Sequence, residues 1–165
     1  MIKTMTVLKK VYFSYNEIDA SCRKSAELIS DSFKPDIILA IGGGGLIPAR
    51  ILRAKLNVPI YVVSLSTYDE NDNPIEEPRI VQWMDFSNFK DKKILIVDEV
   101  DDTRKTLNFL VDKLTKEEGI FSTNLGIFVI HNKIKEKEID YRQLNIDYYH
   151  SSLDVEDKWI VYPWD

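Results

Sequence analysis

The segment from Lys93 to Leu107 restricts the possible folds of this chain more than any other. It begins with a short apolar run, Ile94 to Val97, that is rich in β-branched side chains. Such a run is typical of a strand that is buried on both faces of a parallel sheet. The run ends in an acidic turn, whose acids are Asp98, Glu99, Asp101 and Asp102.

A loop rich in hydroxyl groups and cations follows these acids, with Thr103, Arg104, Lys105 and Thr106. An amphipathic helix comes next, with Leu107, Leu110, Val111 and Leu114 on one face. Ligands of open α/β sheets bind at the carboxyl ends of strands, and a hydroxyl-rich loop at a helix N-terminus suits phosphate. Acids do not bind phosphate, so they predict hydroxyl groups or a metal ion on the same ligand. The segment therefore predicts a sugar phosphate that carries Mg²⁺. A merely solvated turn would not need the buried strand or the threonines.

A second connection between a strand and a helix contains four consecutive glycines, Gly42 to Gly45. It follows the apolar run Ile37 to Ile41 and precedes a helix that extends through Leu56, with Pro48 in its first turn. Consecutive glycines let the backbone approach an anion closely. A tight turn without any ligand is the alternative interpretation.

Composition and charge exclude several classes of protein. The chain has 165 residues, 44% of them hydrophobic, which is enough for one domain with its own core. Its net charge of −5 argues against a broad nucleic-acid-binding surface. A single cysteine, Cys22, excludes an intramolecular disulfide, and no stretch approaches the length of a membrane span. We therefore expect a soluble, cytoplasmic protein without nucleic-acid or membrane partners.

Three segments, IGGGGLIPARILR, ILIVDEVDDTRKTL and KWIVYPWD, together resemble the type I phosphoribosyltransferases, and most closely their 6-oxopurine branch. The resemblance covers about residues 12–165. It implies one α/β domain over residues 1–165, with a mostly parallel sheet and helices on both faces. It also implies a flexible hood loop at about 66–80 and a short C-terminal base pocket at about 157–165. The implied reaction joins guanine, hypoxanthine or xanthine to 5-phosphoribosyl-1-pyrophosphate (PRPP), giving the nucleoside 5′-monophosphate and pyrophosphate.

The resemblance also implies roles for individual residues. Asp102 is the implied catalytic acid/base, and Mg²⁺ is the implied cofactor, with Glu99 and Asp165 as ligands. The implied contacts of the ribose and its 5-phosphate are Asp98, Glu99, Asp101, Thr103, Arg104, Lys105 and Thr106. The implied pyrophosphate contacts are Gly42, Gly43, Gly44 and Arg79, and the implied hood contacts are Thr67 and Tyr68. The implied purine contacts are Lys133, Trp159 and Ile160.

Some positions depart from the family pattern or carry less information. Purine enzymes often have Lys or Arg where this chain has Gly43, and most relatives have Gly at the position of Arg104. We expect a strained or cis peptide at Gly42 and Gly43. The polar stretch from Ser66 to Pro78 indicates a mobile loop, and the charged stretch from Ile134 to Asn145 indicates a peripheral segment. We interpret Trp83, Trp164 and His131 as structural residues.

Two other functions fit the same fold. The first is a regulatory protein that senses PRPP or purines without turnover, although the acidic chain has no spare length for a DNA-binding unit. The second is an enzyme for adenine, orotate or uracil, which the pairing of Lys133 with Trp159 disfavours. The family resemblance further implies a homodimer or a higher homo-oligomer.

Overall fold

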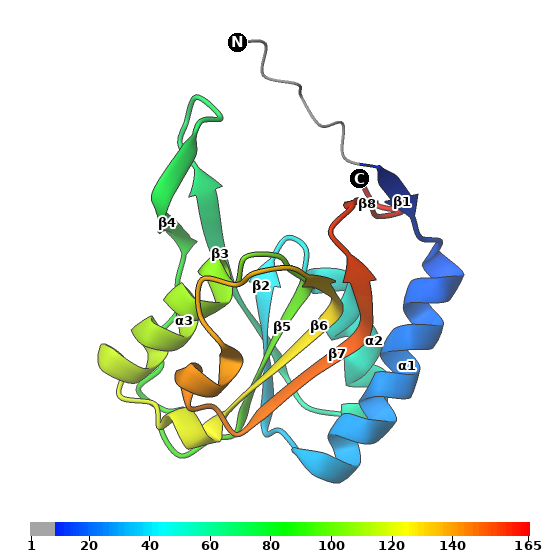
Figure 1. The fold of residues 1–165 in the computed structure, drawn as a ribbon. Coiled ribbons are helices and arrows are strands. Elements are labelled where there is room, and N and C mark those ends of the chain that lie inside the picture. The colour runs from blue at the N-terminus through cyan, green and yellow to red at the C-terminus, as the bar shows by residue number, and fades with distance from the viewer. Residues whose placement is uncertain (1–8) are drawn as a thin grey trace.

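The computed structural model describes residues 9–165 and has the α/β architecture that the sequence predicts (Figure 1). Residues 1–8, which the predicted single domain includes, lie outside the described residues. The helices and strands in chain order are β1 (Lys10–Tyr12), α1 (Tyr15–Ser32), β2 (Ile37–Gly42), α2 (Leu46–Leu56), β3 (Ile60–Tyr68), β4 (Pro74–Gln82), β5 (Ile94–Asp101), α3 (Lys105–Lys116), β6 (Leu125–Ile134), β7 (Tyr148–Glu156) and β8 (Trp159–Val161), with short 3₁₀ helices at Ser122–Asn124 and Tyr141–Leu144.

One six-stranded sheet forms the centre of the fold, in the order β4-β3-β2-β5-β6-β7. All neighbouring strands are parallel except β3 and β4, which form an antiparallel hairpin at one edge. A separate two-stranded parallel sheet joins β1 to β8, so the N-terminal strand lies beside the C-terminal tail (Figure 1). The carboxyl ends of β2, β5 and β6 therefore lie at the same edge of the central sheet.

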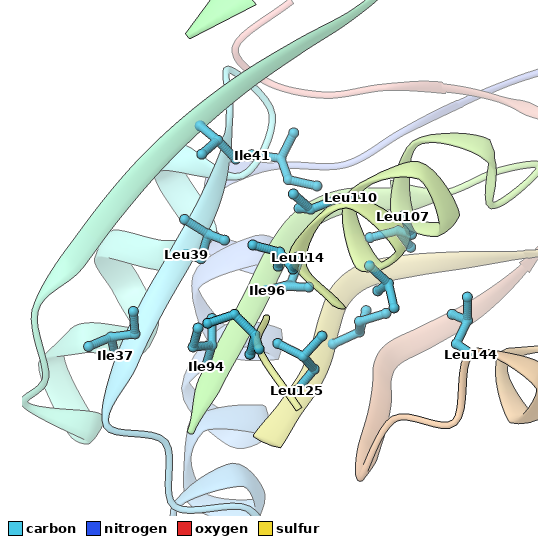
Figure 2. Packing of buried hydrophobic residues seen from close by; sticks show 14 of the residues in the cluster. Ile37, Leu39, Ile41, Ile94, Ile96, Leu107, Leu110, Leu114, Leu125 and Leu144 are labelled. Carbon is cyan, nitrogen blue, oxygen red and sulfur yellow. The ribbon is translucent and has the colours of Figure 1, made fainter. Parts of the chain in front are cut away.

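Helices cover both faces of the sheet because alternate side chains of its buried strands point to opposite faces. On one face, Ile94 and Ile96 of β5 pack against Leu110 and Leu114 of α3 (Figure 2). On the other face, the intervening residues Leu95 and Val97 pack with the apolar sides of α1 and α2. The two cores hold β5 rigidly at the centre, and its acidic end is positioned by that packing.

Helix α1 begins after Ser14, which is its N-cap residue. The Ser14 hydroxyl accepts a hydrogen bond of 3.2 Å from the Glu17 N–H, and the Glu17 carboxylate accepts one of 2.7 Å from the Ser14 N–H. These reciprocal bonds form a capping box, which satisfies N–H groups that lack partners within the helix. Among the described residues, no helix combines the length and the apolar character needed to cross a membrane.

The acids of β5 belong to the strand, so the prediction of an acidic turn from Asp98 onward is wrong. Asp98 pairs in register with Val129 and Asp101 pairs with Asn132, which continues the ladder between β5 and β6. Strand β6 also continues through Ile134, so Lys133 is its penultimate residue. Pairing with β6 supplies hydrogen-bond partners for the backbone N–H and C=O groups of these residues, and it does not depend on the charge of their side chains.

The predicted mobile loop from Ser66 to Pro78 is mostly an antiparallel hairpin. Strand β3 continues to Tyr68 and β4 begins at Pro74, and the pairing of the two strands shifts in register between Ser66 and Tyr68. The Asp69 carboxylate caps the turn between them by accepting hydrogen bonds from the Asn71 and Asn73 N–H groups at 2.8 and 2.9 Å. Polar residues and prolines are tolerated in β4 because it is an edge strand.

Candidate active site

A cavity of about 730 Å³ opens at the carboxyl end of the sheet. It is lined by the strand-end acids, the loop after them, the tip of β3 and the C-terminal tail. The predicted site residues among its lining are Thr67, Tyr68, Asp98, Glu99, Asp101, Asp102, Thr103, Arg104, Lys105, Thr106, Lys133, Trp159, Ile160 and Asp165. The folding of four distant segments thus brings most predicted site residues into one cleft. Arg79, Gly42, Gly43 and Gly44 are not among the lining residues, and the Arg79 guanidinium lies 3.4 Å from Glu70 on the hairpin.

Two buried side chains support the phosphate loop, which comprises residues 102–106. Arg104 has a positive φ of 71°, and its guanidinium contacts the Asp101 carboxylate at 2.6 Å. The two side chains are only 5% and 0% exposed, and the Tyr149 hydroxyl donates another hydrogen bond of 2.6 Å to Asp101. The side chains of Asp101 and Arg104 are therefore engaged with each other beneath the loop, and only their main chain is left to face a ligand.

The segment after β6 holds the same loop by its backbone. The Lys137 ammonium donates hydrogen bonds of 2.8 and 2.6 Å to the carbonyl oxygens of Asp101 and Asp102. The Glu138 N–H donates a further bond of 3.0 Å to the Thr103 carbonyl. The interpretation of this charged segment as peripheral is thus wrong. Its lysines are long enough to reach across to the loop, which a hydropathy pattern does not reveal.

Helix α3 begins directly after the loop and presents its N-terminus at the cleft. Arg104 is the N-cap residue and makes no capping hydrogen bond with its side chain. The first N–H groups of a helix have no partners within the helix, and the helix dipole favours an anion there. Thr103 and Thr106 add two hydroxyls that line the same end of the cleft. This end of the cleft can therefore accept a phosphate group.

Asp98 and Glu99, in the second half of β5, are partly shielded from water and lie close to other negative charges. Burial raises the pKa of Asp98 to about 7, with the charges of Glu99 and Asp101 adding to the rise and the Glu99 N–H opposing it. Burial likewise raises the pKa of Glu99; a hydrogen bond from Trp164 opposes the rise, and the charge of Asp165 adds to it. A cation or a ligand with hydroxyl groups would relieve this crowding.

The glycine loop lies against these acids. The Gly42–Gly43 peptide bond is cis, as expected from the run of glycines. A Cβ atom at Gly44 would lie 2.5 Å from the Glu99 carboxyl carbon, and one at Gly45 would lie 2.2 Å from the Val97 carbonyl oxygen. The absence of side chains at Gly44 and Gly45 therefore lets the loop approach β5 closely, and places its backbone beside Glu99.

The C-terminal tail closes the opposite side of the cleft. The Trp159 side chain is 57% exposed, whereas Ile160 is buried. The Tyr162 hydroxyl donates a hydrogen bond of 3.2 Å to the Glu99 carbonyl, and the Trp164 indole N–H donates one of 3.0 Å to the Glu99 carboxylate. Trp164 is therefore more than a core residue, and no signal in its sequence neighbourhood distinguishes this contact from ordinary packing.

A cluster of two carboxylates and two lysines lies at the base end of the cleft. Lys133 Nζ lies 3.5 Å from Asp102 and 3.8 Å from Asp157. Lys135 Nζ lies 2.9 Å from Asp102 and 3.2 Å from Asp157. Burial tends to raise the pKa of Asp102, but the hydrogen bond and charge of Lys135, with the charge of Lys133, outweigh it and hold that pKa below its usual range. Lys135 and Asp157 were not among the predicted site residues.

The cleft thus combines a helix N-terminus, buried carboxylates, and a lysine–carboxylate cluster beside an exposed indole, which suits a ligand with a phosphate, hydroxyl groups and an aromatic ring. The model of the phosphoribosyl transferase domain matches residues 13–164, and the chain belongs to that family.

Two similar proteins of yeasts are named as purine phosphoribosyltransferases. The chain is 43% identical to hypoxanthine-guanine phosphoribosyltransferase of Schizosaccharomyces pombe, over 94% of this chain and 89% of that protein. It is 39% identical to xanthine phosphoribosyltransferase 1 of Saccharomyces cerevisiae, over 95% and 90%. Among solved structures, a protein of Neisseria gonorrhoeae with bound ppGpp is 42% identical, with a TM-score of 0.82 over 96% of this chain and 90% of that one.

Proposed function

We propose that this protein transfers the 5-phosphoribosyl group of PRPP to a 6-oxopurine base, forming a nucleoside 5′-monophosphate and pyrophosphate. The observation that carries this proposal is the pair of Lys133 and Asp102, whose charged atoms lie 3.5 Å apart in the same cleft as the phosphate loop. The relatives named as hypoxanthine-guanine and xanthine enzymes support it.

The pair matches one edge of a 6-oxopurine. The 6-oxo oxygen of the ring is an acceptor, and the adjacent N7 carries a proton when N9 is the attacking nitrogen. A lysine donates to the first group and a carboxylate accepts from the second, so Lys133 and Asp102 can bind both at once. An adenine presents an amino group in place of the oxygen, and its donors would face the ammonium of Lys133. The pair therefore favours an oxopurine over adenine.

The remaining residues have complementary tasks in this mechanism. The exposed indole of Trp159 offers a stacking surface for the base, and the backbone around Ile160 lies at its edge. Positive charge develops on the ribose as its bond to pyrophosphate breaks, and the carboxylates of Asp98 and Glu99 stabilise that charge. Asp102 takes up the N7 proton as the new bond forms. Thr67 and Tyr68, at the tip of β3, cover the cleft against water.

The carboxylates present fit a magnesium ion that PRPP brings with it. The described residues contain no group of three or more potential metal ligands, so the protein alone does not form a complete site. Glu99 and Asp165 are close enough for their charges to repel, and Mg²⁺ is commonly bound by one or two carboxylates plus substrate phosphates. When bound, Mg²⁺ offsets the charge of the departing pyrophosphate. Glu99 and Asp165 are the residues that would hold it.

A product assay tests the proposal. Purified protein is incubated with PRPP and guanine, hypoxanthine, xanthine or adenine, with and without Mg²⁺, and the nucleotides are separated by chromatography. We expect GMP, IMP or XMP with Mg²⁺, and little AMP. Asp102→Asn should lower kcat by roughly 10²–10⁴ while PRPP still binds, because asparagine preserves shape but cannot accept the proton in the same way. AMP as the main product, or PRPP binding without any turnover, would favour the alternative functions.

The gonococcal relative supports a second ligand. That protein is 42% identical to this chain, and its structure contains bound ppGpp. We therefore infer that ppGpp also binds this chain. Its guanine and its phosphate groups match the base end and the phosphate end of one cleft. Competition should then appear as a higher apparent KM for PRPP in the presence of ppGpp, and GDP serves as the control nucleotide. A homo-oligomeric state and a cytoplasmic location stay predictions.

A further inference from the structure

We propose that Lys135 is a positioning residue, which keeps the Asp102 carboxylate charged and aimed at the base while Lys133 engages the purine. This inference rests on the proposed function and deepens it. Lys135 lies in the segment after β6 and does not line the cleft, unlike Lys133, the lysine proposed to bind the base.

The geometry of the four-residue cluster distinguishes the two lysines. Each lysine contacts both carboxylates, which gives a closed ring of four contacts between 2.9 and 3.8 Å. The shorter contacts to Asp102 and Asp157 are both made by Lys135, at 2.9 and 3.2 Å. Lys133 stands farther from both carboxylates, at 3.5 and 3.8 Å. Lys135 is thus the principal counter-ion of Asp102, and Lys133 is the looser partner.

Access to the cleft separates them as well. Lys133 and Asp102 line the cleft, whereas Lys135 and Asp157 do not. A purine bound in the cleft would therefore contact Lys133 and Asp102, and would not contact Lys135 or Asp157. Once the ammonium of Lys133 turns to the 6-oxo group, Lys135 remains beside the carboxylate. Asp157 also contacts Lys135, at 3.2 Å, and so holds its ammonium beside Asp102.

Asp102 has few other charged neighbours that could replace Lys135. The charged groups facing it are Lys133 on β6 and the ammonium groups of Lys135 and Lys137 in the segment after β6. Lys137 donates to the Asp102 carbonyl and not to its carboxylate. An opposite charge within about 4–6 Å favours the charged form of a carboxylate. Removal of Lys135 should therefore favour protonation of Asp102 and loosen its orientation.

The experiment compares Lys135→Met, Lys135→Arg and the wild type across pH, with guanine as the varied substrate. Lys135→Met should lower kcat roughly 10- to 100-fold, as expected when a reacting group is misplaced. Its acidic limb in the kcat–pH profile should move to higher pH. Lys135→Arg keeps the charge and should restore the profile and most of kcat. The control is Lys116→Met, which removes another lysine–aspartate pair, with Asp112 at 3.2 Å, on the exposed side of α3. It should leave the profile unchanged.

A second readout does not depend on turnover. NMR titration of the Asp102 carboxyl carbon should give a higher pKa in Lys135→Met than in the wild type. If the wild type forms no nucleotide, the proposed function fails, and the titration still tests the coupling of Lys135 to Asp102. A Lys135→Met protein with unchanged Asp102 titration, or with a lower kcat and an unmoved pH profile, would show a structural role only and overturn the inference.

Discussion

The indole nitrogen of Trp164 donates a hydrogen bond of 3.0 Å to Oε2 of Glu99, which connects the C-terminal tail to the acidic end of β5. Tyr162 stacks on Trp164 with ring centroids 4.8 Å apart, and its hydroxyl donates to the Glu99 carbonyl. The tail, which we propose binds the base, and Glu99, which we propose faces the ribose, are therefore held as one unit. Substitutions in the tail should affect PRPP as well as the purine.

Trp164→Phe tests this connection, since phenylalanine retains stacking and loses the donor. It should cost about 1 kcal/mol of unfolding free energy and raise the KM for PRPP. The matched control is Trp83→Phe, because Trp83 also donates through its indole nitrogen, to Glu118 at 2.8 Å, away from the cleft. That variant should lose similar stability with an unchanged KM. Equal KM values for PRPP in the two variants would show that the Trp164 hydrogen bond does not contribute to PRPP binding.

The glycine loop offers a second prediction through two neighbouring positions. A methyl group at Gly45 would collide with backbone, the Val97 carbonyl at 2.2 Å, so Gly45→Ala should lower the melting temperature by several degrees. A methyl group at Gly44 would meet the carboxylate of Glu99, a side chain that can move. Gly44→Ala should therefore fold but bind PRPP and Mg²⁺ more weakly. Thermal melts and PRPP titrations would distinguish the two effects, and a normal PRPP affinity in Gly44→Ala would contradict the proposed role of Glu99.

Substitutions of Trp159 and Lys133 should reduce purine affinity in two different ways. Trp159→Ala removes a stacking surface, so it should weaken all purines alike, by roughly 1–3 kcal/mol if stacking resembles that in nucleic-acid sites. Lys133→Met removes the donor to the 6-oxo group, so guanine and hypoxanthine should lose far more than adenine. Competition binding with the three bases measures both. A uniform loss in Lys133→Met would remove the basis for oxopurine selectivity.

A buried histidine predicts how stability depends on pH. Burial lowers the pKa of His131 from 6.5 to about 4, and its Nδ1 lies 2.9 Å from the Tyr162 hydroxyl. The unfolded chain thus binds a proton between these pH values that the folded chain excludes. The contribution of neutral His131 is complete above about pH 6.5 and is lost as pH falls toward 4.

The variant His131→Gln lacks this titration. From pH 7 to pH 5, the wild type should lose about 2 kcal/mol more unfolding free energy than the variant does. Urea unfolding at the two pH values measures the difference. A constant gap between wild type and variant would mean that His131 titrates normally in the folded protein.

The sequence predicts the composition of the site better than the shape of its surroundings. The acids and the phosphate loop come directly after the apolar run Ile94 to Val97 in a single segment, so that run locates them in the sequence. The limits of that strand are less visible, because Asp98 to Asp101 pair with β6 despite their charge. The hairpin at Ser66 to Pro78 is hidden for a related reason, since an edge strand exposed to water has no apolar periodicity to detect.

Contacts made by long side chains also escaped prediction. Lys135 and Lys137 belong to a charged stretch without periodicity, yet they reach Asp102 and the loop backbone. The family resemblance implies that Arg104 contacts the ribose or its 5-phosphate. Its guanidinium instead enters a buried pair with Asp101, and this geometry depends on β7, which supplies Tyr149. Such partners come from three-dimensional proximity and leave no local signature.

The most direct test of the account is a crystal structure of the protein with GMP. The phosphate should lie within about 2.7–3.2 Å of N–H groups or hydroxyls of residues 103–106. The guanine ring should stack on Trp159, with its 6-oxo oxygen at Lys133 and its N7 at Asp102. A phosphate bound elsewhere, or a guanine whose 6-oxo edge faces away from Lys133 and Asp102, would contradict the account.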